Sequence, residues 1–231
     1  MICFTSDIDW APEEVIYDTL KIFEEFRIKC TIFATHESEA LKKCNKNLFE
    51  IGLHPNLNEG ILNGKGKGAK NIISELIKIY PNSIGIRSHS LTHNSRLLNI
   101  YKELGILYES NTLIPYDFRL KPFRCWSSLT RIPYNWEDDV HYLYDRKFDE
   151  FFFTNYNSNK VYIFDYHPIH VFLNTDTKTT YEKAKSFLNN PEKLFECRNK
   201  NNIGVRDHLI SHLKFLKDRK LKSFNLKELI L

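Results

Sequence analysis

The chain has 231 residues, of which 42% are hydrophobic and 14% are aromatic, and it carries a formal net charge of +4 at pH 7. This composition excludes an intrinsically disordered protein. The length is sufficient for one domain with a sizeable core, which we expect to cover residues 1–231. Lysine and arginine are spread along the sequence and not clustered, so a nucleic acid is not the expected partner.

The cysteines and the amino terminus indicate a reducing compartment. The five cysteines are an odd number without CxxC spacing, which is typical of free thiols and not of a zinc finger. The sequence has no signal-peptide pattern and no apolar stretch as long as a membrane span. We therefore expect a cytoplasmic protein without a transmembrane segment.

Strand and helix patterns alternate along the chain. Strands are predicted at residues 2–5, 30–34, 49–53, 83–86, 106–109 and 161–166. Helices are predicted at 13–26, 38–44, 71–80, 95–104, 181–189 and 206–219, with Ser38 as an N-cap and Gly105 just beyond a helix end. Residues 112–160 are loop-rich, and 223–231 form a final strand or helical turn. This alternation predicts an α/β domain that is doubly wound or barrel-like.

The segment Gly60–Lys70 places glycines between lysines. It lacks the GxxxxGK[ST] spacing of a phosphate-binding loop, and no strand comes directly before it. We predict a mobile loop here, of the kind that can serve as a lid.

Two carboxylates, Asp7 and Asp9, directly follow the first predicted strand. In α/β folds the chemistry lies at the carboxyl ends of parallel strands. Two acids at such an end can divide the work, one binding a metal and the other moving a proton. The alternative is an acidic turn in which Asp9 caps the next helix.

Other ligand-type side chains recur where predicted strands end. They are His36, His54, Arg87, His89, His167 and His170. Because the carboxyl ends of parallel strands meet at one edge of a sheet, these positions predict an active site. His36, however, is expected to be a structural or surface residue, as are His141, His208 and His212.

Several segments carry motifs in a recognisable order. They are Phe4–Asp9, Lys29–Phe33, Glu50–Asn58, Ile84–Arg87, Gly105–Ser110, Phe164–Pro168 and Phe224–Leu229. These motifs resemble those of the polysaccharide deacetylases of the NodB-homology type, carbohydrate esterase family four. Arg87–Leu91, Pro133–Asp139 and His167–His170 are most similar to its WbmS-like branch, which is associated with surface-polysaccharide gene clusters.

The resemblance implies a distorted, incomplete (β/α) barrel of mostly parallel strands, and a divalent metal ion that is usually zinc. It implies that Asp9 is the metal-binding carboxylate and His54 the first of two metal-binding imidazoles. Asp7 would be the general base, Arg87 would pair with it, and His167 would be the general acid. The roles suit the chemistry, since Zn²⁺ polarises an amide carbonyl and an imidazolium can protonate a leaving amine.

The second imidazole departs from the family pattern, because Asn58 stands where a histidine is expected. An amide oxygen is a poorer zinc ligand than an imidazole. Either Asn58 completes the site, or another residue replaces it, for which His89 is preferred over His93. The string His89–His93 also reads HSxxH, the usual spelling of the metal motif, which leaves a second placement of that motif open.

An acidic run follows the loop-rich region. One of Glu137, Asp138 and Asp139 would hydrogen-bond His167 and set its tautomer, and the sequence does not say which. A solvated acidic loop is the alternative.

Substrate contacts are expected from Tyr134, Trp136 and His170. Tyr134 would stack on a sugar, whereas Trp126 is expected to pack in the core.

The combined prediction is a metal-dependent amidohydrolase that removes an N-acyl group, with acetyl as the expected group, from an amino sugar in surface-polysaccharide biosynthesis. The substrate would be nucleotide-linked, lipid-linked or an oligosaccharide. A sugar N-deformylase could use the same site. A degenerate carbohydrate-binding member without turnover is favoured by Asn58 and opposed by the intact Asp7, Asp9, Arg87 and His167. A metal-dependent phosphoesterase would usually need two metals.

Overall fold

The computed structural model describes residues 1–58, 68–125 and 127–231. Most of the predicted loop Gly60–Lys70 lies outside these ranges, and so does Trp126.

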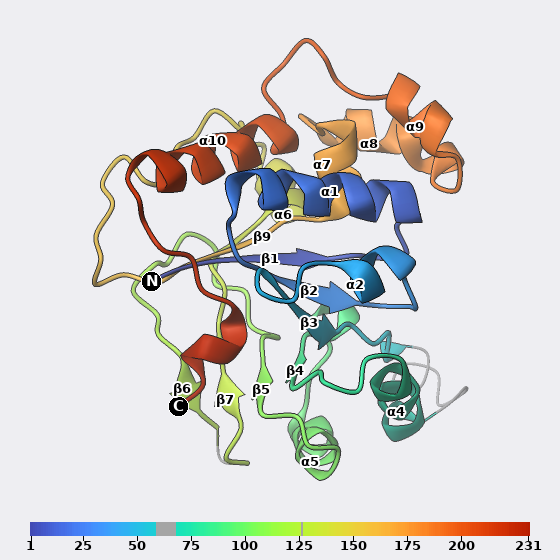
Figure 1. Cartoon of the computed structure of the whole chain (residues 1–231), viewed down its shortest axis with the longest axis vertical. Coiled ribbons are helices and arrows are strands. Elements are labelled where there is room, and N and C mark those ends of the chain that lie inside the picture. The colour runs from blue at the N-terminus through green and yellow to red at the C-terminus, as the bar shows by residue number, and fades with distance from the viewer. Residues whose placement is uncertain (59–67, 126) are drawn as a thin grey trace.

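The described strands form one nine-stranded sheet in the order β6-β7-β5-β4-β3-β2-β1-β9-β8. They are β1 Ile2–Asp7, β2 Cys30–Ala34, β3 Phe49–Leu53, β4 Gly85–Ile86, β5 Tyr108–Glu109, β6 Phe123–Arg124, β7 Thr130–Arg131, β8 Trp136–Glu137 and β9 Tyr162–Asp165. Neighbours are parallel except β6 and β7. The sheet curls from β1 toward β5 and β7, and in the described chain its edge strands β6 and β8 do not pair (Figure 1). The predicted incomplete barrel of mostly parallel strands is confirmed.

Helices lie outside the curled sheet (Figure 1). They are α1 Glu13–Phe26, α2 Glu39–Lys43, α4 Ala69–Ile79, α5 Ser95–Glu103, α6 Asp138–Leu143, α7 Pro168–Leu173, α8 Lys178–Ala184, α9 Pro191–Glu196 and α10 Val205–Asp218, with 3₁₀ turns η1 His89–Leu91, η2 Lys185–Phe187 and η3 Leu226–Leu229. α1, α7 and α10 pack against one another above β1 and β9. Among the helices of the described residues, none is both long and apolar enough to span a membrane.

Side chains of β1 alternate between the two faces of the sheet. Phe4 packs in the outer core under the helices, whereas Cys3 belongs to a smaller cluster inside the half-barrel. Thr5 and Asp7 follow Cys3 with a period of two, so their side chains lie on the inner face. The register pairs Thr5 with Asp165 of β9, which places Asp165 on that face too.

The carboxyl-terminal segment fills the inside of the half-barrel at the end opposite the predicted site. η3 buries both of its leucines in the inner cluster. The Leu226 backbone N–H donates to Thr31 Oγ1 at 2.9 Å, and the Lys227 N–H donates to Glu50 Oε2 at 3.0 Å. The predicted closing strand or turn is therefore a turn that binds β2 and β3 from inside.

Many local predictions hold, but α7 and α9 were not predicted, and the segment predicted to be loop-rich also contains β6, β7, β8 and α6. Ser38 caps α2 by accepting from the Leu41 N–H at 3.3 Å, and Gly105 follows α5 with φ of 79°. Pro12, and not Asp9, precedes α1, and no side-chain bond caps that helix, so the alternative role considered for Asp9 is wrong. The helix predicted at 181–189 instead begins with α8 at Lys178, and η2 continues it.

Candidate active site and metal centre

The loops that follow four strands bring the predicted residues together. Asp9 follows β1, His54 follows β3, His89 follows β4, and His167 follows β9. In the sheet β4 and β3 are adjacent, as are β1 and β9, and β2 lies between the two pairs. Their carboxyl ends therefore form one rim, and the donor atoms of Asp9, His54 and His89 lie within 4.8 Å of one another.

Both imidazoles of this group face the same carboxylate oxygen. His54 Nε2 and His89 Nδ1 each lie 3.1 Å from Asp9 Oδ1. Burial alone would raise the pKa of Asp9, but the two facing imidazoles hold it well below its ordinary value. One carboxylate and two imidazoles with converging donors suit a divalent ion such as Zn²⁺, so the residues present fit the implied metal.

Asn58 and His93 do not contact Asp9 among the described hydrogen bonds. The Asn58 amide donates to Ser90 Oγ at 3.3 Å and accepts from Thr92 Oγ1, so it ties its own loop to the loop of His89. His93 is exposed, and its Nδ1 contacts the Leu91 carbonyl.

The two loops that carry Asp9 and His89 each contain two consecutive residues with left-handed backbone. Asp9 and Trp10 have φ of 37° and 56°, and Ser90 and Leu91 have φ of 55° and 53°. Residues other than glycine adopt this left-handed backbone conformation at a cost in free energy, and residues in such conformations cluster at functional sites. The backbone of these loops is therefore less stable than it could be, and in return it places the side chains of Asp9 and His89 close together.

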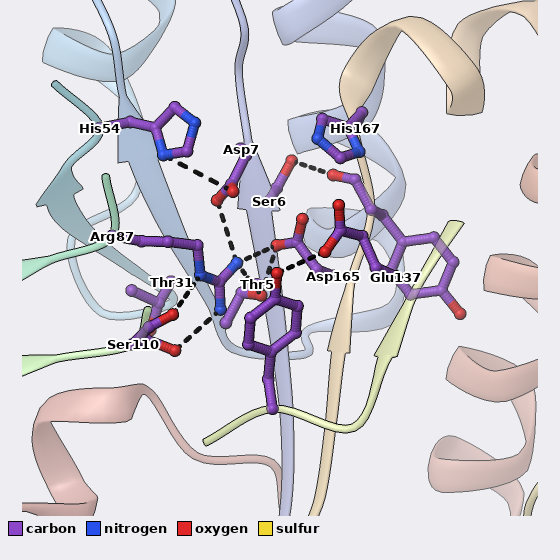
Figure 2. Close-up of polar contacts among 12 residues, drawn as sticks. Thr5, Ser6, Asp7, Thr31, His54, Arg87, Ser110, Glu137, Asp165 and His167 are labelled. Carbon is purple, nitrogen blue, oxygen red and sulfur yellow. Dashed lines mark hydrogen bonds and ion pairs between the residues drawn. The ribbon is translucent and has the colours of Figure 1, made fainter. Parts of the chain in front are cut away.

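Beneath the metal group, Arg87 connects two buried carboxylates (Figure 2). Its Nη1 donates to Asp7 Oδ1 at 3.0 Å and also to Asp165, while Nε and Nη2 donate to Ser110. The guanidinium lies 4.1 Å from the centre of the Tyr134 ring, which covers one face. These contacts hold a fully buried cation between its counter-ions.

Asp7 also faces the metal group. Its Oδ2 lies 3.6 Å from His54 Nδ1, a buried nitrogen without a hydrogen-bond partner among the described residues (Figure 2). Burial raises the pKa of Asp7 to about 6 in spite of Arg87. Asp7 is thus a carboxylate whose pKa lies near neutral pH, where a general base is most effective.

Asp165 was missed by the sequence analysis. It is fully buried and shares Arg87 with Asp7. The signal was present, because an acid inside an otherwise apolar strand indicates a polar partner on the same face. The register between β1 and β9, which supplies that partner, is not readable from the sequence.

His167 is held by Asp138, one of the three acids considered. Asp138 Oδ2 accepts from the His167 backbone N–H at 2.8 Å, and Oδ1 lies 2.7 Å from His167 Nδ1. Burial disfavours the imidazolium, but this carboxylate raises the pKa of His167 well above its ordinary value. The other ring nitrogen of His167, Nε2, lies 3.6 Å from Asp9 Oδ2.

A cavity of about 680 Å³ opens beside this rim. Asp9, His89 and His167 line one side of it, and Trp10 and Tyr181 are among the other lining residues. A volume of this size is typical of a small-molecule site.

Of the three residues predicted to contact the substrate, one lines the cavity and two are buried elsewhere. His170 lines the cavity, and burial lowers its pKa to about 3, so its imidazole is neutral. Tyr134 and Trp136 are each only 1% exposed: the first covers Arg87, and the second packs against Phe164 of the core. Neither can stack on a sugar, so the expectation for these two is wrong.

Three of the remaining histidines lie away from the rim, whereas His36 follows β2. His141, His208 and His212 are buried in an aromatic cluster around Trp136, as expected of structural residues. Only His36 is partly exposed in this set.

The chain is similar to known proteins in both sequence and structure. The model of the family described as "WbmS-like: Polysaccharide deacetylase" matches residues 4–185. A solved structure from Bordetella bronchiseptica, described as a polysaccharide deacetylase involved in O-antigen biosynthesis, aligns with 37% identity and a TM-score of 0.87, covering 93% of this chain and 90% of that one. Comparison with curated proteins finds no match.

More distant structures share the fold. A peptidoglycan N-acetylglucosamine deacetylase aligns with 13% identity and a TM-score of 0.51, over 99% of this chain and 87% of that one. A protein from Mycobacterium smegmatis described as a polysaccharide deacetylase aligns with 14% identity and a TM-score of 0.50, over 96% and 91%. With the family model matching most of the chain, and the motifs meeting at one rim of an incomplete barrel, the protein belongs to the WbmS-like polysaccharide deacetylase family.

Proposed function

We propose that the protein is a metal-dependent amidohydrolase that removes an N-acetyl group from an amino sugar used in surface-polysaccharide biosynthesis. The observation that carries the proposal is the convergence of Asp9, His54 and His89 beside a cavity that Asp9, His89 and His167 line. Family membership supports the same reaction class.

Asp9, His54 and His89 would hold the cation, for which zinc is the proposed identity. When bound, a divalent ion of this kind polarises a carbonyl group and makes a coordinated water more acidic. The protein's own contribution is a set of donors whose orientation is fixed, because His54 is buried and both imidazoles already face Asp9.

Asp7 would accept the proton of the attacking water. Arg87 keeps one oxygen of Asp7 in a charge-assisted hydrogen bond, which leaves Oδ2 on the side of His54. Asp165 is also paired with Arg87, so one buried guanidinium contacts two buried carboxylates.

His167 would donate its Nε2 proton to the leaving nitrogen. Asp138 holds Nδ1, so the proton available for transfer is the one that faces the cavity. Without this proton the leaving group would depart as an unstable amide anion, which makes a general acid necessary.

The substrate proposed is an amino sugar linked to a nucleotide, a lipid or an oligosaccharide, and the proposed compartment is the cytoplasm. The Bordetella bronchiseptica relative is described as involved in O-antigen biosynthesis, which supports a surface glycan as the end product here.

Metal content and amine release together test the proposal. The purified protein should bind one zinc ion and release amine and acetate from a panel of N-acetylated sugar nucleotides and oligosaccharides. His54→Ala should abolish release and reduce bound zinc, while the exposed His93→Ala should leave both unchanged. Release of formate in place of acetate would identify a deformylase. Glycan binding without any release would identify a non-catalytic member, and two bound metals would favour a phosphoesterase.

A further inference from the structure

Trp10 presents its indole to solvent beside the candidate metal group. The side chain is 48% exposed and belongs to neither hydrophobic cluster of the described residues. Its φ of 56° is strained for a bulky side chain, and it directly follows the strained Asp9. A strained, exposed aromatic residue adds nothing to the core, so its position calls for a ligand.

The indole is a wall shared by two cavities. It lines the 680 Å³ cavity beside His89 and a second cavity of about 460 Å³. Thr35 and Asn56 line the second cavity, together with Ile72 of α4. The rings of Trp10 and His89 meet edge to face with centroids 5.1 Å apart. Trp10 therefore lies on the boundary of both cavities.

Trp10 and the residues that line the second cavity together suit a sugar ring. One face of a pyranose presents C–H groups that pack on an aromatic ring, while its hydroxyl groups need hydrogen-bond partners. In the second cavity Thr35, His36 and Asn56 offer such partners, and Ile72 adds apolar surface.

We propose that Trp10 determines substrate length: its indole stacks on the sugar next to the one that reacts and directs it into the second cavity. The residue thereby favours an oligosaccharide over a single amino sugar. This inference rests on the proposed function, because it places the reacting sugar at the metal group.

The test compares a single sugar with a longer one in the zinc-loaded protein. The probes are N-acetylglucosamine and its β-1,4-linked tetramer for amine release, and glucosamine and its tetramer, which cannot be deacetylated, for calorimetric binding. We expect kcat/KM and affinity to be higher for the tetramers. Trp10→Ala should reduce the tetramer advantage about tenfold, and Trp10→Phe should retain most of it.

Two further variants locate the effect. Ile72→Trp should fill the second cavity and weaken only the tetramers, since Ile72 lies on α4 away from the metal group. Tyr17→Ala removes an aromatic side chain that is 60% exposed but lines neither cavity, and it should change nothing.

The outcomes separate the two proposals. Equal kcat/KM and affinity for short and long probes, or a tetramer advantage that survives in Trp10→Ala, overturns the role of Trp10. Absence of amine release from every acetylated sugar, with tetramer binding that still depends on Trp10, overturns the proposed function and leaves the inference standing. If the unaltered protein does not bind the tetramers, the inference about Trp10 is also overturned.

Discussion

The stability of the protein should fall in mild acid because of one buried histidine. His212 lies on α10 with no exposed surface, and its Nδ1 shares the Tyr166 hydroxyl with His208 at 3.1 Å and 3.0 Å. Phe153 and Phe164 lie on either side, each with its ring centroid 4.9 Å from the imidazole. This burial lowers the pKa of His212 from 6.5 to about 3.

The sign and size of the effect follow from these values. Above pH 6.5 the imidazole is neutral in both the folded and the unfolded chain, and the stability is fully present. As the pH falls from 6.5 toward 3, the unfolded chain takes up the proton first, so the folded state loses free energy. At pH 5 the loss from His212 alone is about 2 kcal/mol.

Urea unfolding at pH 7.5 and pH 5 measures this loss in the native protein and in His212→Asn. The asparagine keeps a polar group near the position of Nδ1 but cannot be protonated, and its packing cost is the same at both pH values. The unfolding free energy of the variant should therefore fall about 2 kcal/mol less across the interval. The exposed His93→Asn is the control and should behave like the native protein. The reasoning is refuted if His212→Asn loses as much stability in acid as the native protein.

Three other predictions concern the interior and the site. Asp138→Asn should lower kcat about 10²–10⁴-fold with zinc content unchanged, and the loss of activity at high pH should begin at a lower pH, because the carboxylate no longer raises the pKa of His167. Asp7→Asn should lower kcat while zinc, measured by mass spectrometry, stays bound; a 10–100-fold loss of zinc affinity would show that Asp7 only orients its neighbouring metal ligand. Gly85→Ala should cost about 1–3 kcal/mol in thermal unfolding, since a Cβ there would lie 2.0 Å from a tyrosine ring of β5. A Cβ at Gly68 meets no atom of the described residues within 4 Å, so Gly68→Ala should cost little.

The rim of the barrel could be predicted because polar residues at strand ends are a local signal. Asp9, His54 and His167 each directly follow, or lie two residues beyond, the end of a strand. Parallel pairing then brings such ends together without further information. The specific pairing of Asp7 with Arg87 came from the family resemblance, and the structure shows that contact.

The direction of a side chain could not be predicted in the same way. Trp136 and Glu137 are consecutive in β8, so they point to opposite faces, and which face is inside depends on pairing with Phe164 and Asp165. A shift of one residue in the register of β8 would move the side chains of Trp136 and Glu137 to the opposite faces of the sheet. That His89 and not Asn58 faces Asp9 likewise could not be predicted. The loop of His89 has left-handed backbone at Ser90 and Leu91, and neither residue type indicates this conformation in the sequence.

The way the chain ends inside the half-barrel separates two boundaries that are often treated as one. The family model matches residues 4–185, yet the buried Glu50 carboxylate accepts a backbone N–H from Lys227, which lies beyond that match. A protein shortened to residues 4–185 would leave that acid short of a donor and expose the leucine-lined interior of the sheet. The unit that folds therefore extends beyond the matched segment, as the alignment with the Bordetella bronchiseptica structure over 93% of the chain also indicates, and variants intended to isolate the catalytic region must retain the last residues.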